Sequence, residues 1–173
     1  MLRCAILDDY QGTALERGDF ARFSGAIAID VFREHIADTE TLAARLKDHD
    51  IVVAMRERTP FDAARLRRLP KLKLLVTTGP RNAAIDLDAA RACGVVVSGT
   101  PGSSGSAAEL TWGLLLALVR HIPLEVANLR QGGPWQLTVG RDLAGMTLGV
   151  IGPGTLGNRM AAYGKAFADL YLL

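Results

Sequence analysis

Short apolar runs alternate with helical patterns along the first hundred residues, and this alternation limits the fold more than any other feature of the chain. Unbroken apolar runs are typical of strands in a parallel sheet, with helices as the crossover connections. The sequence therefore predicts an α/β fold in which residues 1–100 form a flavodoxin-like, doubly wound parallel sheet covered by helices on both faces. The five expected strands are residues 4–7, 27–31, 51–55, 74–77 and 95–97.

Local capping signals predict where two helices begin. Thr59 precedes Pro60, so its hydroxyl is expected to cap a helix that has proline at its first position. Ser106 and Glu109 have the spacing of a capping box, which predicts the start of a second helix. The segment 98–105 before it is rich in glycine and serine and is typical of a hinge.

A glycine pattern near residue 152 predicts a dinucleotide-binding loop. It follows the apolar run 147–151 and opens the helical run 158–167, which is the strand–turn–helix context that such a loop needs. In this hypothesis one glycine makes a tight turn, the next lets a pyrophosphate approach the backbone, and the last lets the helix pack closely. Two amides then face the phosphates. The candidate cofactor-binding residues are Gly152, Gly154, Thr155, Leu156 and Gly157.

The alternative for this segment is a plain glycine-rich turn, and Pro153 removes one amide from the loop. An acidic residue that binds the ribose is expected about twenty residues after the glycines, at the end of the strand predicted at 170–173. Asp169 precedes that strand and is interpreted as a turn residue. Residues 136–173 are thus predicted to be the first part of a Rossmann NAD-binding domain. We expect the segment 147–173 of this incomplete half-domain to be covered by a second copy of the chain or to be poorly ordered.

The segment 107–121 predicts a helix with hardly any polar face. A helix that is apolar on all sides must be buried on all sides, and one small domain could scarcely cover it. Residues 101–135 are therefore predicted to form an interdomain arm, with helix 107–121 buried between domains or between the subunits of a dimer. His121 ends this helix, which is a favourable place for a cation.

Arginine-containing loops follow two neighbouring strands of the predicted sheet. Open parallel sheets bind ligands at the carboxyl ends of their strands, and arginines beside a helix N-terminus suit a carboxylate or a phosphate. The alternative is that these arginines are solvated and paired with nearby acids such as Glu57. The candidate substrate-binding residues are Arg56, Arg58, Thr78, Gly79 and Arg81.

Composition and the remaining titratable residues argue against several other functions. A formal net charge of +2 offers no electrostatic basis for binding nucleic acid or an acidic membrane. The longest apolar stretch, 114–119, is far shorter than the ~18–20 residues of a membrane span. His35 and His49 lie near turns without a carboxylate at a telling spacing, and no metal-ligand set is expected. Cys4 and Cys93 are predicted to be buried, reduced thiols of a cytoplasmic protein.

Several motifs together resemble the D-isomer-specific 2-hydroxyacid dehydrogenases, the family that includes the phosphoglycerate dehydrogenases. They are similar to that family's substrate-domain signature, its hinge, the start of its long dimerising helix and the approach to its glycine loop. In that order the matching segments are residues 71–79 with 84–86, 94–97 with 100–102, 108–111 and 141–149.

The resemblance implies an NAD- or NADP-dependent oxidoreductase that interconverts 2-keto acids and D-2-hydroxy acids and works as a dimer. The family's catalytic arginine, glutamate and histidine follow the glycine loop by many tens of residues, so we expect none of them among these 173 residues. The chain is accordingly interpreted as a truncated member without turnover of its own. Two positions depart from the family pattern: Arg81 stands where a second glycine is usual, and Pro80 cannot donate the amide often offered to the substrate carboxylate.

Two other functions remain open. One is a non-catalytic binding or oligomerisation module, a flavodoxin-like domain with a dimerising arm. The other is a response-regulator receiver domain, suggested by Asp8 and Asp9 at the end of the first expected strand. A receiver also needs an aspartate after its third strand and a lysine after its fifth, whereas residues 55–56 and 98–99 are MR and SG here.

Overall fold

The computed structural model describes residues 1–102, 105–152, 154–167 and 171–172. The chain forms two compact units, Met1–Gly102 and Ser103–Leu173. The sequence-based interpretations of Pro153 and Asp169 lie outside the described residues. The arm predicted at 101–135 belongs for the most part to the same unit as the glycine loop.

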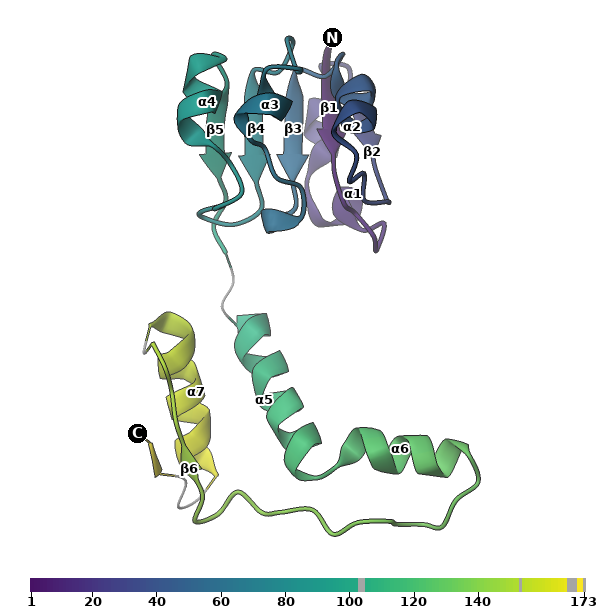
Figure 1. Cartoon of the computed structure of the whole chain (residues 1–173), viewed down its shortest axis with the longest axis vertical. Helices are drawn as coiled ribbons and strands as arrows, with labels where there is room; N and C mark the ends of the chain where they lie inside the picture. The colour runs from purple at the N-terminus through teal and green to yellow at the C-terminus, as the bar shows by residue number, and fades with distance from the viewer. Residues whose placement is uncertain (103–104, 153, 168–170, 173) are drawn as a thin grey trace. The chain divides into compact units, whose positions relative to one another are not determined.

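The first unit contains a five-stranded, all-parallel sheet in the order β2-β1-β3-β4-β5 (Figure 1). This is the strand order of flavodoxin-like folds, and it confirms the predicted fold class. The last strand includes Ser98 and Gly99, which the sequence assigned to the hinge. The strands are β1 (Leu2–Ile6), β2 (Ile27–Val31), β3 (Ile51–Ala54), β4 (Leu74–Thr77) and β5 (Val96–Gly99).

Aspartates begin the helices that follow β2, β3 and β4. Asp38, Asp62 and Asp86 each accept a hydrogen bond from the backbone amide three residues later, which satisfies an amide that the helix leaves unpaired. The predicted cap at Thr59 is therefore wrong, because Asp62 caps this helix. The helices of this unit are α1 (Ala14–Arg17), α2 (Thr39–Leu46), α3 (Ala63–Leu66) and α4 (Leu87–Ala92), with 3₁₀ turns η1 (Phe20–Phe23) and η2 (Arg56–Arg58).

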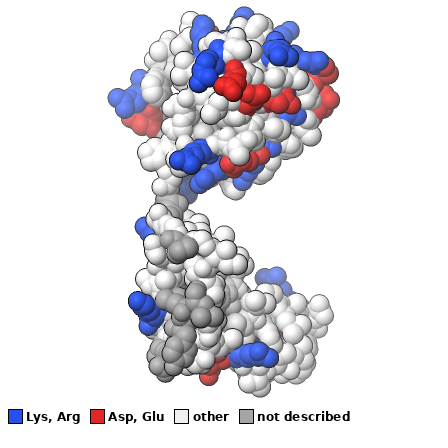
Figure 2. Space-filling model, turned by 60° about the vertical axis from the view of Figure 1, so that its left-hand side comes forward, with Lys and Arg blue, Asp and Glu red and all other residues white. Residues whose placement is uncertain are grey.

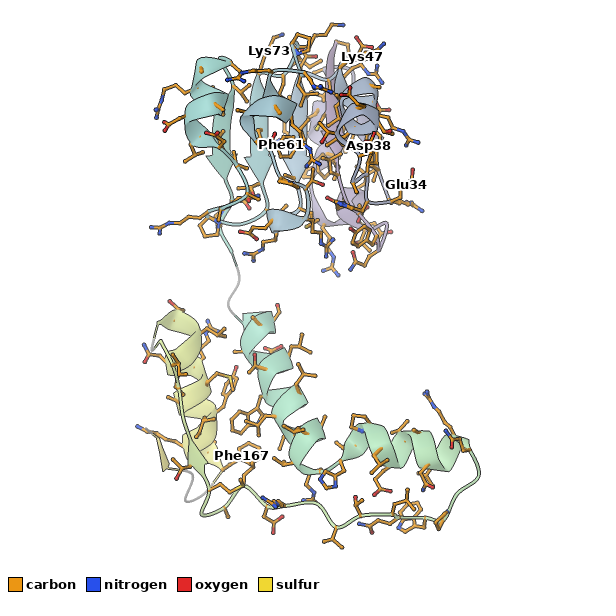
Figure 3. All side chains as sticks on the ribbon, in the orientation of Figure 1. Glu34, Asp38, Lys47, Phe61, Lys73 and Phe167 are labelled. Carbon is orange, nitrogen blue, oxygen red and sulfur yellow. The ribbon has the colours of Figure 1, made fainter. Side chains whose placement is uncertain are left out.

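The core of the first unit lies between the sheet and α2, α3 and α4, which cover one of its faces (Figure 1). Phe61 is fully buried in this core (Figure 3). On β3 and β4 burial alternates, so that Val52 and Leu75 are buried whereas their neighbours on the opposite face are partly exposed. Val96 on β5 is 64% exposed. Among the described residues the second face of β3–β5 is therefore only partly covered, whereas the sequence predicted helices on both faces.

The second unit consists of α5 (Gly105–Val119), α6 (Ile122–Arg130), β6 (Thr147–Leu148), α7 (Thr155–Ala166) and β7 (Tyr171–Leu172). α7 lies between β6 and β7 in the sequence, and the two strands pair in parallel, which makes a β–α–β unit. Trp112 of α5 packs edge-on against Tyr163 of α7, beside the buried Met160. Because α5 already includes Gly105, Ser106 lies inside the helix and is not its cap, contrary to the sequence-based prediction.

Large apolar side chains are exposed on α5. Leu110, Leu114 and Leu118 are 64%, 62% and 74% exposed, whereas Ala108 and Trp112 are buried. Within the described residues of the second unit, the helix predicted to be buried on all sides is thus covered on one side only. Figure 2 shows few charged side chains on the visible face of this unit. Among the described residues no single helix is long and apolar enough to cross a membrane, although α5 and α6, bent by 66°, pass that test as a pair.

Candidate functional site

Residues with positive φ mark the carboxyl ends of three neighbouring strands. Asp8 after β1, Arg56 after β3 and Gly79 after β4 have φ values of +56°, +53° and +134°. Non-glycine residues with positive φ are uncommon and gather at functional sites, and open parallel sheets bind ligands at this edge. The carboxyl edge of β1, β3 and β4 is therefore the candidate site of the first unit.

Arg56 is held by its backbone, while its side chain makes no ion pair among the described residues. Its amide donates to Thr78 Oγ1 at 3.1 Å, and its carbonyl accepts from Asn82 Nδ2 at 2.7 Å. The guanidinium lies against Gly79, because a Cβ on that glycine would be 2.9 Å from Arg56 Nη1. A fixed backbone and an uncommitted guanidinium suit this residue to binding an anion.

Thr78 and Gly79 use their polar groups within the protein. The hydroxyl of Thr78 accepts from Arg56, and the amide of Gly79 donates to Thr100 Oγ1 at 2.8 Å. The amide of Thr100 in turn donates to the Gly79 carbonyl at 2.9 Å. These two predicted site residues therefore shape the loop that faces Arg56, with their hydroxyl and amide already engaged.

Arg58 and Arg81 differ from Arg56 in their surroundings. Arg58 Nη1 donates to the carbonyl of Asp8 at 2.9 Å, and its guanidinium lies 4.6 Å from the centre of the Tyr10 ring. Arg81 is exposed and lines a cavity of about 430 Å³ with Asn82. Within the described part of the chain none of the three arginines forms an ion pair with Glu57 or another acid, so that part of the alternative interpretation is not seen. The exposed Arg81 agrees with its other part, a solvated side chain.

The glycine loop lies in the second unit. Gly152 has φ +79°, and Gly154 precedes α7 with open space where a Cβ would be. A Cβ on Gly157 would lie 2.9 Å from the Gly152 carbonyl oxygen, so α7 packs too closely on the loop to admit a larger residue. Asn158 makes the first helical hydrogen bond, to Gly154, and leaves the preceding amides of Thr155, Leu156 and Gly157 at the positive end of the helix.

The structure pairs two histidines with carboxylates that the sequence-based interpretation did not identify. His35 Nδ1 lies 2.9 Å from Asp8 Oδ1, and His49 Nε2 lies 2.9 Å from Asp30 Oδ2. Neither carboxylate lies at a spacing that the sequence could reveal, because the two pairs join segments 19 or more residues apart. Hydrogen bonds from Arg3 and then His49 lower the pKa of Asp30.

The two cysteines have different environments. Cys4 is buried on β1, and burial, followed by the charge of Asp30, raises the pKa of its thiol to about 11. Cys93 is exposed, which corrects the prediction that both thiols are buried. Among the residues that the structure describes, no cluster of three or more histidine, cysteine, aspartate or glutamate side chains could hold a metal ion.

Comparison with known proteins identifies the family to which this architecture belongs. Residues 7–168 match the model of the D-isomer specific 2-hydroxyacid dehydrogenase catalytic domain. A D-3-phosphoglycerate dehydrogenase of Methanocaldococcus jannaschii is 38% identical over 74% of this chain and 25% of its own length. A hydroxypyruvate reductase of Thermotoga maritima is 34% identical over 80% of this chain and 45% of its own length.

A solved structure of a phosphoglycerate oxidoreductase from Vibrio cholerae superimposes with a TM-score of 0.92 at 37% identity, over 100% of this chain and 56% of that one. The chain thus spans between a quarter and a little over half of these proteins. The family match accounts for both the sheet order and the glycine loop, and it sets aside the receiver-domain hypothesis. The chain belongs to the D-isomer specific 2-hydroxyacid dehydrogenase family.

Proposed function

We propose that the protein is an NAD- or NADP-dependent oxidoreductase that interconverts a 2-keto acid and a D-2-hydroxy acid. Membership of the family supports this proposal, and two relatives are named as a phosphoglycerate dehydrogenase and a hydroxypyruvate reductase. The observation that carries it within this chain is Arg56, a guanidinium without a carboxylate partner among the described residues, at the edge where parallel sheets bind ligands.

In this proposal Arg56 binds the carboxylate of the substrate. Its planar fork matches a carboxylate, and such charge-assisted hydrogen bonds contribute about 1.5–3 kcal/mol. Thr78 and Asn82 orient it by holding its backbone amide and carbonyl. Arg81, at the rim of the neighbouring cavity, is placed to contact a second polar group on the substrate. Arg58 and Gly79 support the loops around this position.

The glycine loop fits the pyrophosphate of a dinucleotide. Gly152 supplies the positive φ of the turn, Gly154 leaves room for the phosphate, and Thr155 and Leu156 present amides at the N-terminus of a twelve-residue helix. Gly157 permits the close packing of that helix on the loop. When bound, the cofactor supplies the nicotinamide that gives or accepts a hydride.

Binding of oxalate, an unreactive analogue of a 2-keto acid, tests the substrate site. Calorimetric titration of the purified chain is expected to show saturable binding that Arg56→Gln weakens about tenfold to a hundredfold, from the loss of a charge-assisted hydrogen bond. Arg91→Gln is the matched control, because Arg91 is an exposed arginine on α4 paired only with Asp88 in the described structure. Equal losses in the two variants, or none in either, would contradict the proposal.

The absence of turnover in residues 1–173 stays a prediction, as does a cytoplasmic location. Oxidation of NADH by the purified chain in the presence of glyoxylate, pyruvate or hydroxypyruvate would contradict the first of these. Binding without turnover would agree with it.

The second candidate function is a non-catalytic oligomerisation module. The leucines exposed on α5 favour it, because a row of large apolar side chains marks an interaction surface. We also propose that helix 107–121 forms the dimer contact in either function. The module hypothesis predicts a dimer that fails to bind oxalate and NADH, and a dimer that binds them favours the oxidoreductase.

A further inference from the structure

We propose that Asp8 is a positioning residue for the anion site, because it holds the loop that carries Arg56. The part of this inference that concerns ligand binding rests on the proposed function. Asp8 itself lies too deep to meet a ligand, since it is only 1% exposed. It acts through Arg58 and Thr59, which follow Arg56 in the same loop.

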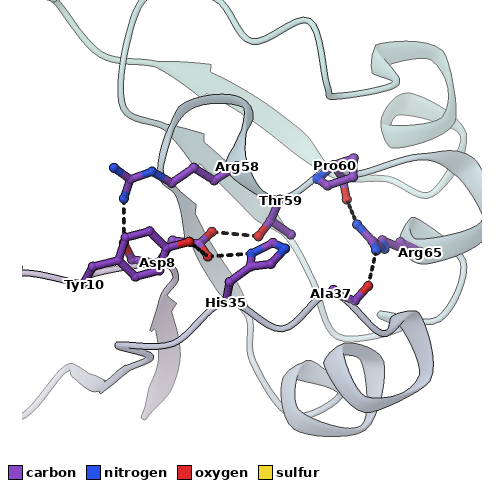
Figure 4. A network of polar contacts seen from close by, with 8 residues as sticks. All are labelled: Asp8, Tyr10, His35, Ala37, Arg58, Thr59, Pro60 and Arg65. Carbon is purple, nitrogen blue, oxygen red and sulfur yellow. Dashed lines mark hydrogen bonds and ion pairs between the residues drawn. The ribbon is translucent and has the colours of Figure 1, made fainter.

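Asp8 joins three loops at the carboxyl edge of the sheet (Figure 4). Its Oδ2 accepts from Thr59 Oγ1 at 2.7 Å, and its backbone carbonyl accepts from Arg58 Nη1 at 2.9 Å. Its Oδ1 lies 2.9 Å from His35 Nδ1 and accepts from the Tyr10 hydroxyl at 3.3 Å. A buried carboxylate with this many donors holds the surrounding loops in place, because the donors must keep their positions to offset the desolvation of the carboxylate.

The loop after β3 is held on both sides of Arg56. Upstream, β3 ends at Ala54 in the middle of the sheet. Downstream, Thr59 is buried against Asp8, and the Pro60 carbonyl accepts from Arg65 Nη1 at 2.8 Å. A non-glycine residue keeps a φ of +53° only where the surrounding structure enforces it. The hold of Asp8 on Thr59 and Arg58 is one of these constraints, and Thr78 and Asn82 supply the others.

This arrangement gives the two arginines of the loop different roles. Arg58 is committed to the Asp8 carbonyl and the Tyr10 ring, so it anchors the loop. Arg56 is left with a guanidinium that no carboxylate engages in the described structure. The neighbouring Asp9 has a different task, because its carboxylate accepts from the amides of Thr13 and Ala14 at the start of α1. Asp9 is thus a control that shares the burial of Asp8 and leaves the Arg56 loop untouched.

The experiment uses the whole chain, labelled with ¹⁵N, and combines amide spectra with titration by oxalate. Thr59→Val keeps the side-chain shape and removes the hydroxyl that donates to Asp8, so we expect oxalate binding about three- to tenfold weaker, the equivalent of one hydrogen bond. The amide signals of Arg56 and Thr78 should shift in the ligand-free protein. Thr59→Ser retains the hydroxyl and should bind as the wild type does, and Asp9→Asn should change neither readout.

The inference is overturned if Thr59→Val leaves both the oxalate affinity and the ligand-free signals of Arg56 and Thr78 unchanged. If Thr59→Val does not fold, Asp8→Asn decides the question by the same readouts, since it keeps the shape and replaces one acceptor oxygen with a donor. If the wild type does not bind oxalate, the proposed function fails. The ligand-free shifts of Arg56 then still decide whether Asp8 positions this loop.

Discussion

Replacing Gly99 with alanine tests how tightly the loop after β4 packs on β5. A Cβ at this position would lie 2.8 Å from the Pro80 carbonyl oxygen and 2.9 Å from that of Gly79. Both neighbours are backbone atoms, so the loop must retreat by roughly 0.5 Å to reach ordinary van der Waals distance. It cannot do so freely, because Thr100 bonds Gly79 through both its hydroxyl and its amide.

The expected cost of Gly99→Ala is about 1–3 kcal/mol in the free energy of unfolding of the first unit, the range typical of overpacking. For a domain of this size each kcal/mol lowers Tm by about 4–8 °C. Chemical denaturation followed by far-ultraviolet circular dichroism measures the loss. Both tryptophans of the chain, Trp112 and Trp135, lie in the second unit, so tryptophan emission reports on that unit separately.

Gly102→Ala is the matched control for this prediction. Its Cβ would meet its nearest atom, Pro80 Cδ, at an ordinary 3.5 Å, so the change should cost less than about 0.5 kcal/mol. Oxalate binding should weaken in Gly99→Ala alone, because the retreating loop carries Gly79 away from Arg56. Equal stability of the two variants would refute the reasoning, as would a Gly99→Ala loss confined to the tryptophan signal.

Three further predictions concern other parts of the molecule. A thiol reagent at pH 8 should modify Cys93 in the folded protein and Cys4 only after unfolding, because Cys4 is buried with a pKa of about 11. Equal rates of modification of the two thiols in the folded protein would contradict this. The pKa of Asp30 is lower in the folded protein than in the unfolded chain, chiefly because Arg3 donates a hydrogen bond to it. The ionised carboxylate therefore stabilises the folded protein at pH values above the ordinary aspartate pKa, and this stabilisation is lost as the pH falls through the folded-state pKa. Asp30→Asn should therefore reduce the loss of folding stability at acid pH. An unchanged loss would show that the Arg3–Asp30 pair does not cause it. Leu114→Glu should convert the proposed dimer to a monomer in light scattering, and a dimer that persists would place the contact elsewhere.

The predicted elements that proved correct depend on short stretches of chain. The strands at 27–31 and 74–77 have the predicted bounds, and the sheet is parallel as predicted. The capping interpretation of Thr59 was wrong for an instructive reason. A hydroxyl followed by proline is a genuine local signal, but Asp8, 51 residues earlier, takes that hydroxyl, and Asp62 caps the helix instead.

The sequence predicted a region for the candidate site, which stays a prediction, and it did not predict the role of each residue there. Placement of arginines after two neighbouring strands was enough to locate the carboxyl edge of the sheet, because parallel strands end on the same side. Nothing in the local sequence separates Arg56 from Arg58. That difference arises because one guanidinium contacts Asp8 and Tyr10 while the other lies against Gly79, and these contacts join loops from three strands.

The sequence by itself therefore determined the fold class, the family resemblance and the position of the glycine loop, since apolar periodicity and glycine spacing act over a few residues. The tertiary structure alone decided that the Arg58 guanidinium contacts Asp8 whereas the Arg56 guanidinium lies against Gly79. It also decided why Asp8 is buried, and that one face of β3–β5 is only partly covered in the described chain. Those properties depend on strand order and register, which bring together residues that lie tens of positions apart. Side-chain roles at the sheet edge follow from those distant contacts.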